Sequence, residues 1–175
     1  MDKKLILFTD IGDTVIDEAS EERDAPFGVV LRARCIPGAR ETLLELRRRG
    51  YAIAMVADGL TASFKNTMAQ NGLSHVFSAW IVSETLGSQK PAEKMFRAAM
   101  DALGLTDADK GRVLMVGNNL ERDIVGANRF GIRSALLDWS PRYRHEPLSA
   151  EETPDHVIHA PGELIALAER LNAEL

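Results

Sequence analysis

Short apolar runs alternate with amphipathic stretches along this chain, and this alternation limits the possible folds more than any other feature. Five runs predict β-strands, at residues 4–9, 51–57, 79–83, 112–117 and 132–137. Most of them are apolar at successive positions, which is typical of parallel strands covered by helices on both faces. Strand–helix alternation with right-handed crossovers predicts an α/β fold built on a three-layer, doubly wound parallel sheet.

The stretches between these runs carry helix signals. Apolar residues recur there every three or four positions, and glycine follows most of the expected ends. Helices are expected at residues 37–49, 61–71, 91–103, 121–130 and 161–171. The chain has 175 residues, 45% of them apolar, which suffices for one hydrophobic core. A single domain over residues 1–175 is therefore expected.

Charge and cysteine content exclude several classes of protein. Lys and Arg number 21 and Asp and Glu 26, so the net charge of −5 disfavours a general nucleic-acid binder. Cys35 is the only cysteine, which excludes an internal disulfide and a cysteine zinc cluster. No signal-peptide pattern is present, and no apolar stretch approaches the roughly 20 residues of a membrane helix. We therefore expect a cytoplasmic protein without membrane or nucleic-acid partners.

Polar residues follow the expected strands at the carboxyl edge of the sheet, where doubly wound folds bind ligands. Carboxylate and amide oxygens form the oxygen-rich site that Mg²⁺ prefers, and a lysine beside them can balance a phosphoryl group. An aspartate held there can act as a nucleophile. Each residue alone could equally be a helix cap or part of a turn. Capping does not readily explain their joint placement; the set is Asp10, Asp13, Asp58, Lys90, Asn118 and Asp123.

These residues resemble the motifs of the haloacid dehalogenase-like (HAD) superfamily of hydrolases. The family pattern is an apolar strand with Asp-x-Asp-Gly-Thr, a Ser or Thr ending the second strand, a Lys often followed by Pro, and a final Gly-Asp-x-x-x-x-Asp. Here the motifs correspond to residues 10–14, Ala57, Lys90 and residues 117–123. Together they are specific, although each alone is weak. The resemblance spans about residues 5–137 and implies a Rossmann-like HAD core.

The resemblance also implies a role for each matching residue. Asp10 is expected to be the nucleophile, and Lys90 to hold both Asp10 and the phosphate. Mg²⁺ is the expected cofactor, with Asp10, the carbonyl oxygen of Gly12, Asn118 and Asp123 as its ligands. Asn118 and Asp123 would bind it directly or through water. The phosphate is expected to contact Lys90 and a cradle of backbone N–H groups near Gly12, Asp13, Asp58 and Gly59.

Three positions depart from the family pattern. Gly12 stands where phosphatases carry a second aspartate, whose proton transfer to the leaving oxygen is typically worth about 10²–10⁴ in rate. Ala57 replaces the hydroxyl residue of the second strand, which removes a phosphate hydrogen bond. Asn118 replaces an acidic metal ligand and lowers the expected metal affinity. Asp13 is adjacent to Gly12, and the sequence leaves open whether its side chain takes over the proton transfer.

The motif spacing predicts a chain without a separate cap domain. Only residues 15–35 lie between the first motif and the expected helix at residues 37–49, too few for a helical cap. They are expected to form a short flap, either an ordinary hairpin with solvated arginines or a cover that brings Arg32 and Arg34 to the crevice. Residues 138–160 are expected to form a surface loop and an edge segment. An open crevice suits a large substrate or a neighbouring subunit that acts as a lid, so a homo-oligomer is plausible.

Two functions of different classes follow from this site. The first is a Mg²⁺-dependent HAD-type hydrolase, a phosphatase acting through an aspartyl-phosphate on Asp10 with weakened acid/base catalysis. Its substrate would be a phosphorylated small molecule or macromolecule. The alternative is a low-activity or non-catalytic HAD-fold protein that binds a phosphorylated ligand or partner, which the changes at Gly12, Ala57 and Asn118 favour. A phospho-accepting receiver domain shares the acidic strand ends but needs a different order of residues, and ranks last.

Overall fold

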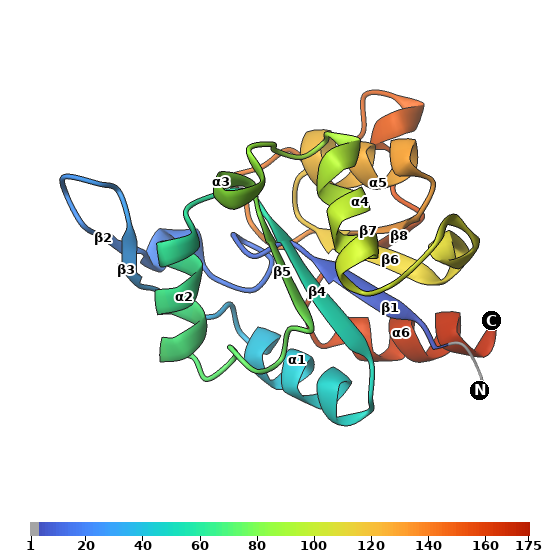
Figure 1. Cartoon of the computed structure of the whole chain (residues 1–175), viewed down its shortest axis with the longest axis horizontal. Coiled ribbons are helices and arrows are strands. Elements are labelled where there is room, and N and C mark those ends of the chain that lie inside the picture. The colour runs from blue at the N-terminus through green and yellow to red at the C-terminus, as the bar shows by residue number, and fades with distance from the viewer. Residues whose placement is uncertain (1–3) are drawn as a thin grey trace.

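The computed structural model describes residues 4–175 and contains a six-stranded, fully parallel sheet (Figure 1). Its strand order is β5–β4–β1–β6–β7–β8. The strands are β1 (Ile6–Thr9), β4 (Ala52–Ala57), β5 (Ala79–Val82), β6 (Val113–Gly117), β7 (Arg133–Leu137) and β8 (His156–Ile158). The five predicted strands and the parallel α/β class are confirmed.

The sixth strand, β8, was not predicted. It lies within residues 138–160, where the sequence analysis placed a surface loop and an edge segment. β8 pairs with β7 at the edge of the sheet, with Ile158 opposite Leu137. Only Ile158 of its three residues is buried, so the strand lacks the apolar run on which the other assignments depended.

Helices cover both faces of the sheet, as predicted. The side chains of α1, α2 and α6 share one core with one face of the sheet, and those of α4 and α5 share a second core with the other face. Figure 1 shows α1 and α6 below the sheet and α4 and α5 above it. These helices are α1 (Ala39–Arg48), α2 (Thr61–Gln70), α4 (Glu93–Ala102), α5 (Val125–Phe130) and α6 (Glu163–Ala173).

The central strand shows why the runs are apolar at successive positions. Leu7 of β1 belongs to the core under α1 and α6, whereas Ile6 and Phe8 belong to the core under α4 and α5. All three are at most 5% exposed, so neither face of β1 meets solvent. A polar residue at any of these positions would lose its hydration without gaining a partner.

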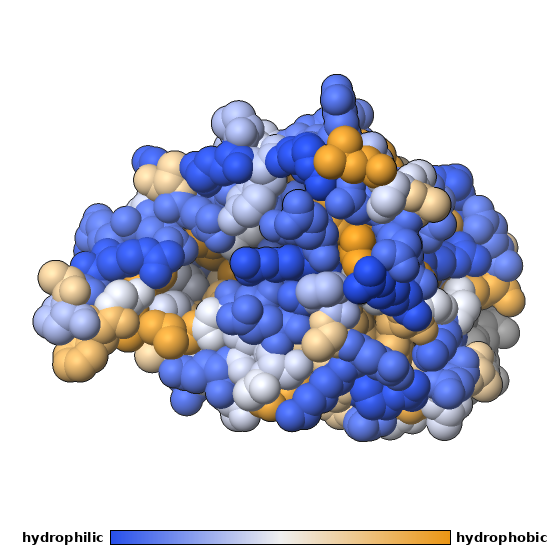
Figure 2. Space-filling model, turned by 90° about the horizontal axis from the view of Figure 1, so that it is seen from above, coloured by the Kyte–Doolittle hydropathy of each residue, from blue (hydrophilic) through white to orange (hydrophobic). Residues whose placement is uncertain are grey.

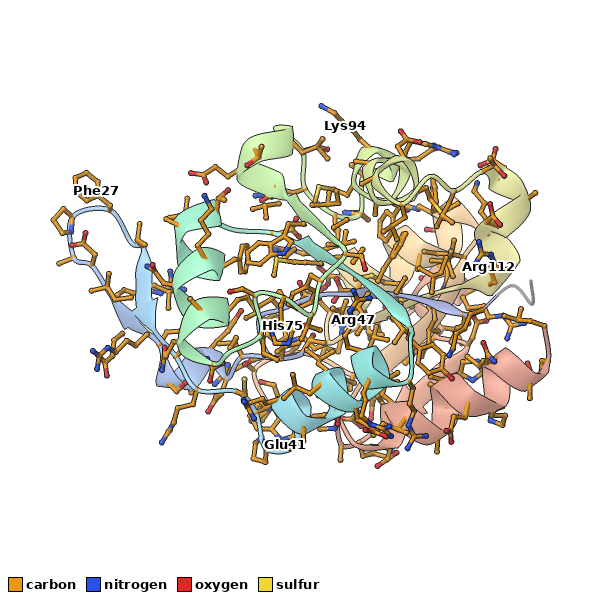
Figure 3. All side chains as sticks on the ribbon, turned by 60° about the horizontal axis from the view of Figure 1, so that its bottom comes forward. Phe27, Glu41, Arg47, His75, Lys94 and Arg112 are labelled. Carbon is orange, nitrogen blue, oxygen red and sulfur yellow. The ribbon has the colours of Figure 1, made fainter. Side chains whose placement is uncertain are left out.

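A two-stranded hairpin projects from one end of the molecule (Figure 1). Its strands are β2 (Glu22–Arg23) and β3 (Val30–Arg32), and Phe27 lies between them at the tip, 76% exposed (Figure 3). The hairpin is held against α2, because the Ser63 hydroxyl accepts a hydrogen bond from the Val30 N–H at 2.9 Å. In the described part of the chain the insert is this hairpin with a short 3₁₀ turn, η1 (Glu18–Ser20), and no cap domain is present.

The topology gathers three loops at one edge of the sheet. The chain passes from β1 outward to β4 and β5 on one side, and then returns to β6, β7 and β8 on the other side. The loops after β1, β4 and β6 therefore lie next to one another at the strand carboxyl ends, beside the topological switch point. Within residues 4–175, no helix is both long and apolar enough to span a lipid bilayer.

Candidate active site

A cavity of about 170 Å³ lies at this edge, between the loops of the sheet and the hairpin. The residues predicted from the strand ends line it, with the exception of Asp13. From the same face of the molecule as α4 and α5, Figure 2 shows a largely hydrophilic surface with hydrophobic residues gathered at the hairpin end, on the left. Predicted site residues in the lining are Asp10, Gly12, Asp58, Gly59, Lys90, Asn118 and Asp123.

Lys90 connects the two aspartates at the centre of the site. Its Nζ donates to Asp10 Oδ1 and to Asp123 Oδ1, each at 2.7 Å. The side chains of Lys90 and Asp123 are 1% exposed, whereas that of Asp10 is 14% exposed. Burial lowers the pKa of Lys90, but the neighbouring carboxylates of Asp10 and Asp123 outweigh it and the net pKa is raised. The lysine is therefore a fixed cation beside Asp10.

Three oxygen atoms converge on the other side of Asp10. The Asn118 amide faces Gly12 O and Asp10 Oδ2, and its two orientations have different consequences. With Nδ2 turned inward it donates to Gly12 O at 3.2 Å and to Asp10 Oδ2 at 3.3 Å. With Oδ1 turned inward, three acceptors face one another, an arrangement that a hard cation would stabilise. The residues present therefore fit a divalent cation held by one carboxylate, one carbonyl and one amide oxygen.

Two of the three oxygen atoms in this cluster, the Gly12 carbonyl oxygen and the Asn118 amide oxygen, are neutral. Among the described residues, no group of three or more His, Cys, Asp or Glu side chains is arranged to hold a metal ion. Both oxygens of Asp123 already have partners, because Oδ1 accepts from Lys90 and Oδ2 accepts from the Asn119 N–H at 3.0 Å. Gly117 makes room for this carboxylate, since a Cβ there would lie 2.6 Å from Asp123 Cβ. Asp123 is thus placed to influence a bound metal through a bridging water molecule or through its ion pair with Lys90.

Two N–H groups of the predicted phosphate cradle have hydrogen-bond partners within the chain. The Gly59 N–H donates to Ser83 Oγ at 2.9 Å, and the Asp13 N–H donates to the Ile16 carbonyl at 2.7 Å. The part of these two groups in phosphate binding stays a prediction, because each donates to another group of the chain in this structure. No sequence pattern pointed to Ser83, which begins the short helix α3 (Ser83–Leu86) directly after β5.

Asp58 holds the Lys90 backbone from the loop after β4. Its Oδ1 accepts from the Lys90 N–H at 3.0 Å. Its Oδ2 is buried and has no hydrogen-bond partner within residues 4–175, and Arg122 Nη1 lies 3.8 Å away. Burial raises the pKa of Asp58, although the nearby Lys90 opposes that shift. One carboxylate oxygen in the lining is therefore available to a hydrogen-bond donor on a ligand.

Asp13 cannot take over the role missing at Gly12, because its side chain points away from the cavity. It is fully buried, with φ at 51°, and its carboxylate accepts from Ser140 Oγ and Arg142 Nε, each at 2.7 Å. Arg142 Nη2 also pairs with Asp13 Oδ1. Residues 138–145 are thus more than the surface loop that the sequence predicted, since Ser140 is fully buried and Arg142 neutralises Asp13.

The cavity wall also contains residues that were not predicted from the sequence, among them Glu18 and Tyr143. Tyr143 Oη donates to Glu18 Oε2 at 3.1 Å. Burial and the nearby Asp13 carboxylate raise the pKa of Glu18, and burial together with Glu18 raises the pKa of Tyr143 to about 12. Glu18 lies in an acidic run that is typical of a solvated flap. Tyr143 lies 125 positions after Glu18 in the chain. No local pattern connects them.

Comparison with known proteins places the chain in a family. Residues 3–131 match the haloacid dehalogenase-like hydrolase family. The chain belongs to that family. Asp10, Lys90, Asn118 and Asp123 all lie in the matched region, whereas Tyr143 and Arg142 lie beyond it.

Two curated relatives are phosphatases. The glyceraldehyde 3-phosphate phosphatase of Methanopyrus kandleri is 30% identical over 135 residues, which are 77% of this chain and 57% of that protein. The phosphoserine phosphatase of Thermus thermophilus is 32% identical over 139 residues, 79% of this chain and 53% of that protein. The chain therefore spans little more than half the length of these relatives.

A solved structure shows the same fold. The magnesium-bound HAD-hydrolase YfnB of Bacillus subtilis superposes with a TM-score of 0.67 at 22% identity, covering 77% of this chain and 56% of YfnB. The match agrees with the Rossmann-like fold described above.

Proposed function

We propose that this chain is a Mg²⁺-dependent phosphoric-ester hydrolase that acts through an aspartyl-phosphate on Asp10. One observation carries the proposal: Lys90 Nζ lies 2.7 Å from Asp10 Oδ1, and Asp10 is the more exposed of the two aspartates that share it. A carboxylate held beside a fixed cation and open to a cavity suits attack on a phosphoryl group. The phosphatase relatives support the same class of substrate.

The residues divide the work of the reaction. Asp10 attacks phosphorus and the ester bond breaks. Lys90 orients Asp10 and balances the negative charge that the phosphoryl oxygens carry, while Asp123 and Asp58 hold Lys90 through its side chain and backbone. Bound Mg²⁺ would supply a second positive charge to the phosphoryl oxygens, held by Asp10, the Gly12 carbonyl and Asn118. Water then attacks the aspartyl-phosphate, and Asp10 is restored.

The substrate is proposed to be a phosphorylated small molecule. The relatives named above act on phosphorylated metabolites, and the cavity adds two groups that could recognise such a molecule, Asp58 Oδ2 and Arg122. Coverage of the crevice by a second copy of the chain, cytoplasmic location and the lack of nucleic-acid or membrane partners remain predictions.

A second candidate function is ligand binding without turnover. It is favoured by the changes at Gly12, Ala57 and Asn118, which remove a proton donor, a hydrogen bond to the phosphoryl group and a charged metal ligand. Each missing hydrogen bond to a charged group is worth roughly 1.5–3 kcal/mol. Weak phosphate binding slows turnover without removing the nucleophile.

Hydrolysis of p-nitrophenyl phosphate separates the two functions. The wild type is assayed with and without Mg²⁺ beside Asp10→Asn, with Asp101→Asn, an exposed residue of α4, as the matched control. We expect turnover that requires Mg²⁺, is lost in Asp10→Asn and is unchanged in Asp101→Asn. Equal rates for wild type and Asp10→Asn would refute Asp10 as the nucleophile and favour the binding function.

A further inference from the structure

We propose that Glu18 is the acid/base residue of this site, supplying from the flap the carboxyl group that position 12 lacks. The inference rests on the proposed hydrolase function and assigns its missing proton donor. Glu18 lies in η1 and reaches back into the cavity beside the loop that carries Asp10.

The Glu18 carboxyl group occupies the space beside Gly12. A Cβ on Gly12 would overlap Glu18 Oε1 and would lie 3.0 Å from Glu18 Cδ. Gly12 is not among the glycines with positive φ, so its backbone conformation would accept a side chain. The Glu18 carboxyl group therefore fills the volume where a side chain at position 12 would begin. A side chain at position 12 would therefore require the Glu18 carboxyl group to move out of this space.

The surrounding residues also fix Glu18 in place. Its backbone N–H donates to Asp13 Oδ1 at 2.9 Å, and Tyr143 Oη donates to its Oε2 at 3.1 Å. Arg142 pairs with Asp13 and, at 3.2 Å, with Asp17 just before Glu18. The buried Asp13 therefore holds the backbone of Glu18, and Tyr143 in the loop at 138–145 holds the Glu18 side chain.

No ion pair among the described residues explains why Glu18 faces the cavity. Within residues 4–175, no Lys, Arg or His nitrogen lies within 4.0 Å of its carboxylate, whereas Asp10, Asp13 and Asp123 each have such a partner. Glu18 and Asp10 both line the cavity. A carboxyl group with one oxygen held by a tyrosine and the other next to the nucleophile's loop is placed for proton transfer.

The chemistry balances in two steps. Asp10 forms a bond to phosphorus, the bond to the ester oxygen breaks, and the leaving oxygen takes the electron pair and the Glu18 proton. In the second step Glu18 removes a proton from water as the water oxygen attacks phosphorus. The bond between phosphorus and Asp10 breaks, phosphate leaves, and Glu18 is again protonated.

Single-turnover release of the leaving group tests the proposal, with enzyme in excess over p-nitrophenyl phosphate or phenyl phosphate and Mg²⁺ present. Nitrophenolate leaves readily without a proton, whereas phenolate needs one. We expect Glu18→Gln to slow phenol release by about 10²–10⁴ and nitrophenol release by less than about tenfold. Glu22→Gln, an exposed glutamate of β2, is the matched control and should leave both rates unchanged.

Position 12 provides a second test that leaves Glu18 itself unaltered. Gly12→Ala puts a Cβ into the space of the Glu18 carboxyl and should reproduce the selective loss with phenyl phosphate. Glu18→Ala combined with Gly12→Asp moves the carboxyl to the other position, and should release phenol at least about tenfold faster than Glu18→Ala alone.

The outcomes separate this inference from the proposed function. Equal slowing of both esters by Glu18→Gln, or no slowing of either, would overturn the role of Glu18 while Asp10-dependent turnover stands. Failure of the wild type to release either leaving group in an Asp10-dependent way would overturn both. Selective loss in Gly12→Ala would support the role even where Glu18→Gln does not fold.

Discussion

Lys90 and Asp123 form an ion pair that is closed to solvent, with Lys90 Nζ 2.7 Å from Asp123 Oδ1 and both side chains 1% exposed. Removing one partner of such a pair leaves an uncompensated charge in the interior, which typically costs about 3–5 kcal/mol. The same lysine holds Asp10, so stability and catalysis depend on one amino group.

Lys90→Met is therefore expected to lower the free energy of unfolding by about 3–5 kcal/mol and to abolish Asp10-dependent hydrolysis. Urea unfolding measures the first effect. Lys94→Met is the control, because Lys94 lies exposed on α4 (Figure 3) and should change stability by less than about 0.5 kcal/mol. A loss below about 1 kcal/mol in Lys90→Met would contradict the buried pair.

Asn118→Asp is expected to tighten Mg²⁺ binding, since cation affinity rises with the number of charged ligands. Without Mg²⁺ the variant should melt below the wild type, because a further carboxylate then faces Asp10. Thermal unfolding across a Mg²⁺ titration should show half-maximal stabilisation at a concentration about tenfold lower than in the wild type. Gln89→Glu adds the same charge at an exposed position and should not shift the titration; identical curves for all three proteins would rule out Asn118 as a ligand.

Arg142→Gln is expected to destabilise the protein by about 2 kcal/mol, less than the full cost of an unpaired buried charge. Asp13 is fully buried, but Arg142 is 36% exposed, and Ser140 and the Glu18 N–H still hold the carboxylate. The variant should also turn over phenyl phosphate more slowly, because the Glu18 backbone loosens with Asp13. Arg144→Gln in the same loop should cost less than about 1 kcal/mol, and equal losses in the two variants would contradict this account.

Asp109→Asn tests how stability depends on pH. The Thr106 N–H and the Arg112 guanidinium lower the pKa of Asp109, and Arg112 also donates to the Lys4 carbonyl before β1. A lowered folded pKa gives stability that is present above the unfolded value of 3.8 and is lost as pH falls toward the folded value. The wild type should exceed the variant in urea midpoint at pH 7, and the gap should narrow between about pH 4 and pH 3.

A difference in urea midpoint that stays constant across this pH range would show that the charge of Asp109 does not contribute to stability. The control is Asp101→Asn, which removes an exposed carboxylate of α4. It should follow the wild type at each pH.

Most of the sheet could be predicted because most of its strands are buried on both faces and so appear as apolar runs in the sequence. Asp10, Lys90, Asn118 and Asp123 could be found because strand ends in a parallel sheet share one edge. β8 could not be found, since its single buried residue, Ile158, makes no pattern.

The rest of the site depends on contacts between distant segments, which no local pattern encodes. The Ser83 hydroxyl, at the start of the helix after β5, accepts a hydrogen bond from the Gly59 N–H, which was expected to face a phosphate. Glu18 resembles its acidic neighbours in the flap, and only the fold turns it inward. Its carboxyl group lies in the space that a Cβ at position 12 would enter.

The hydrogen bond between Tyr143 and Glu18 joins residues 125 positions apart, so we expect it to form late when the protein is synthesised. A ribosome adds Glu18 early and Tyr143 late, so a nascent chain can pair its central strands before the tyrosine exists. Domains fold as their residues emerge, and distant contacts form last. The nucleophile and its lysine can therefore meet while the acid/base carboxyl still lacks its hydroxyl partner. Full activity is expected only after the loop at 138–145 has left the ribosome.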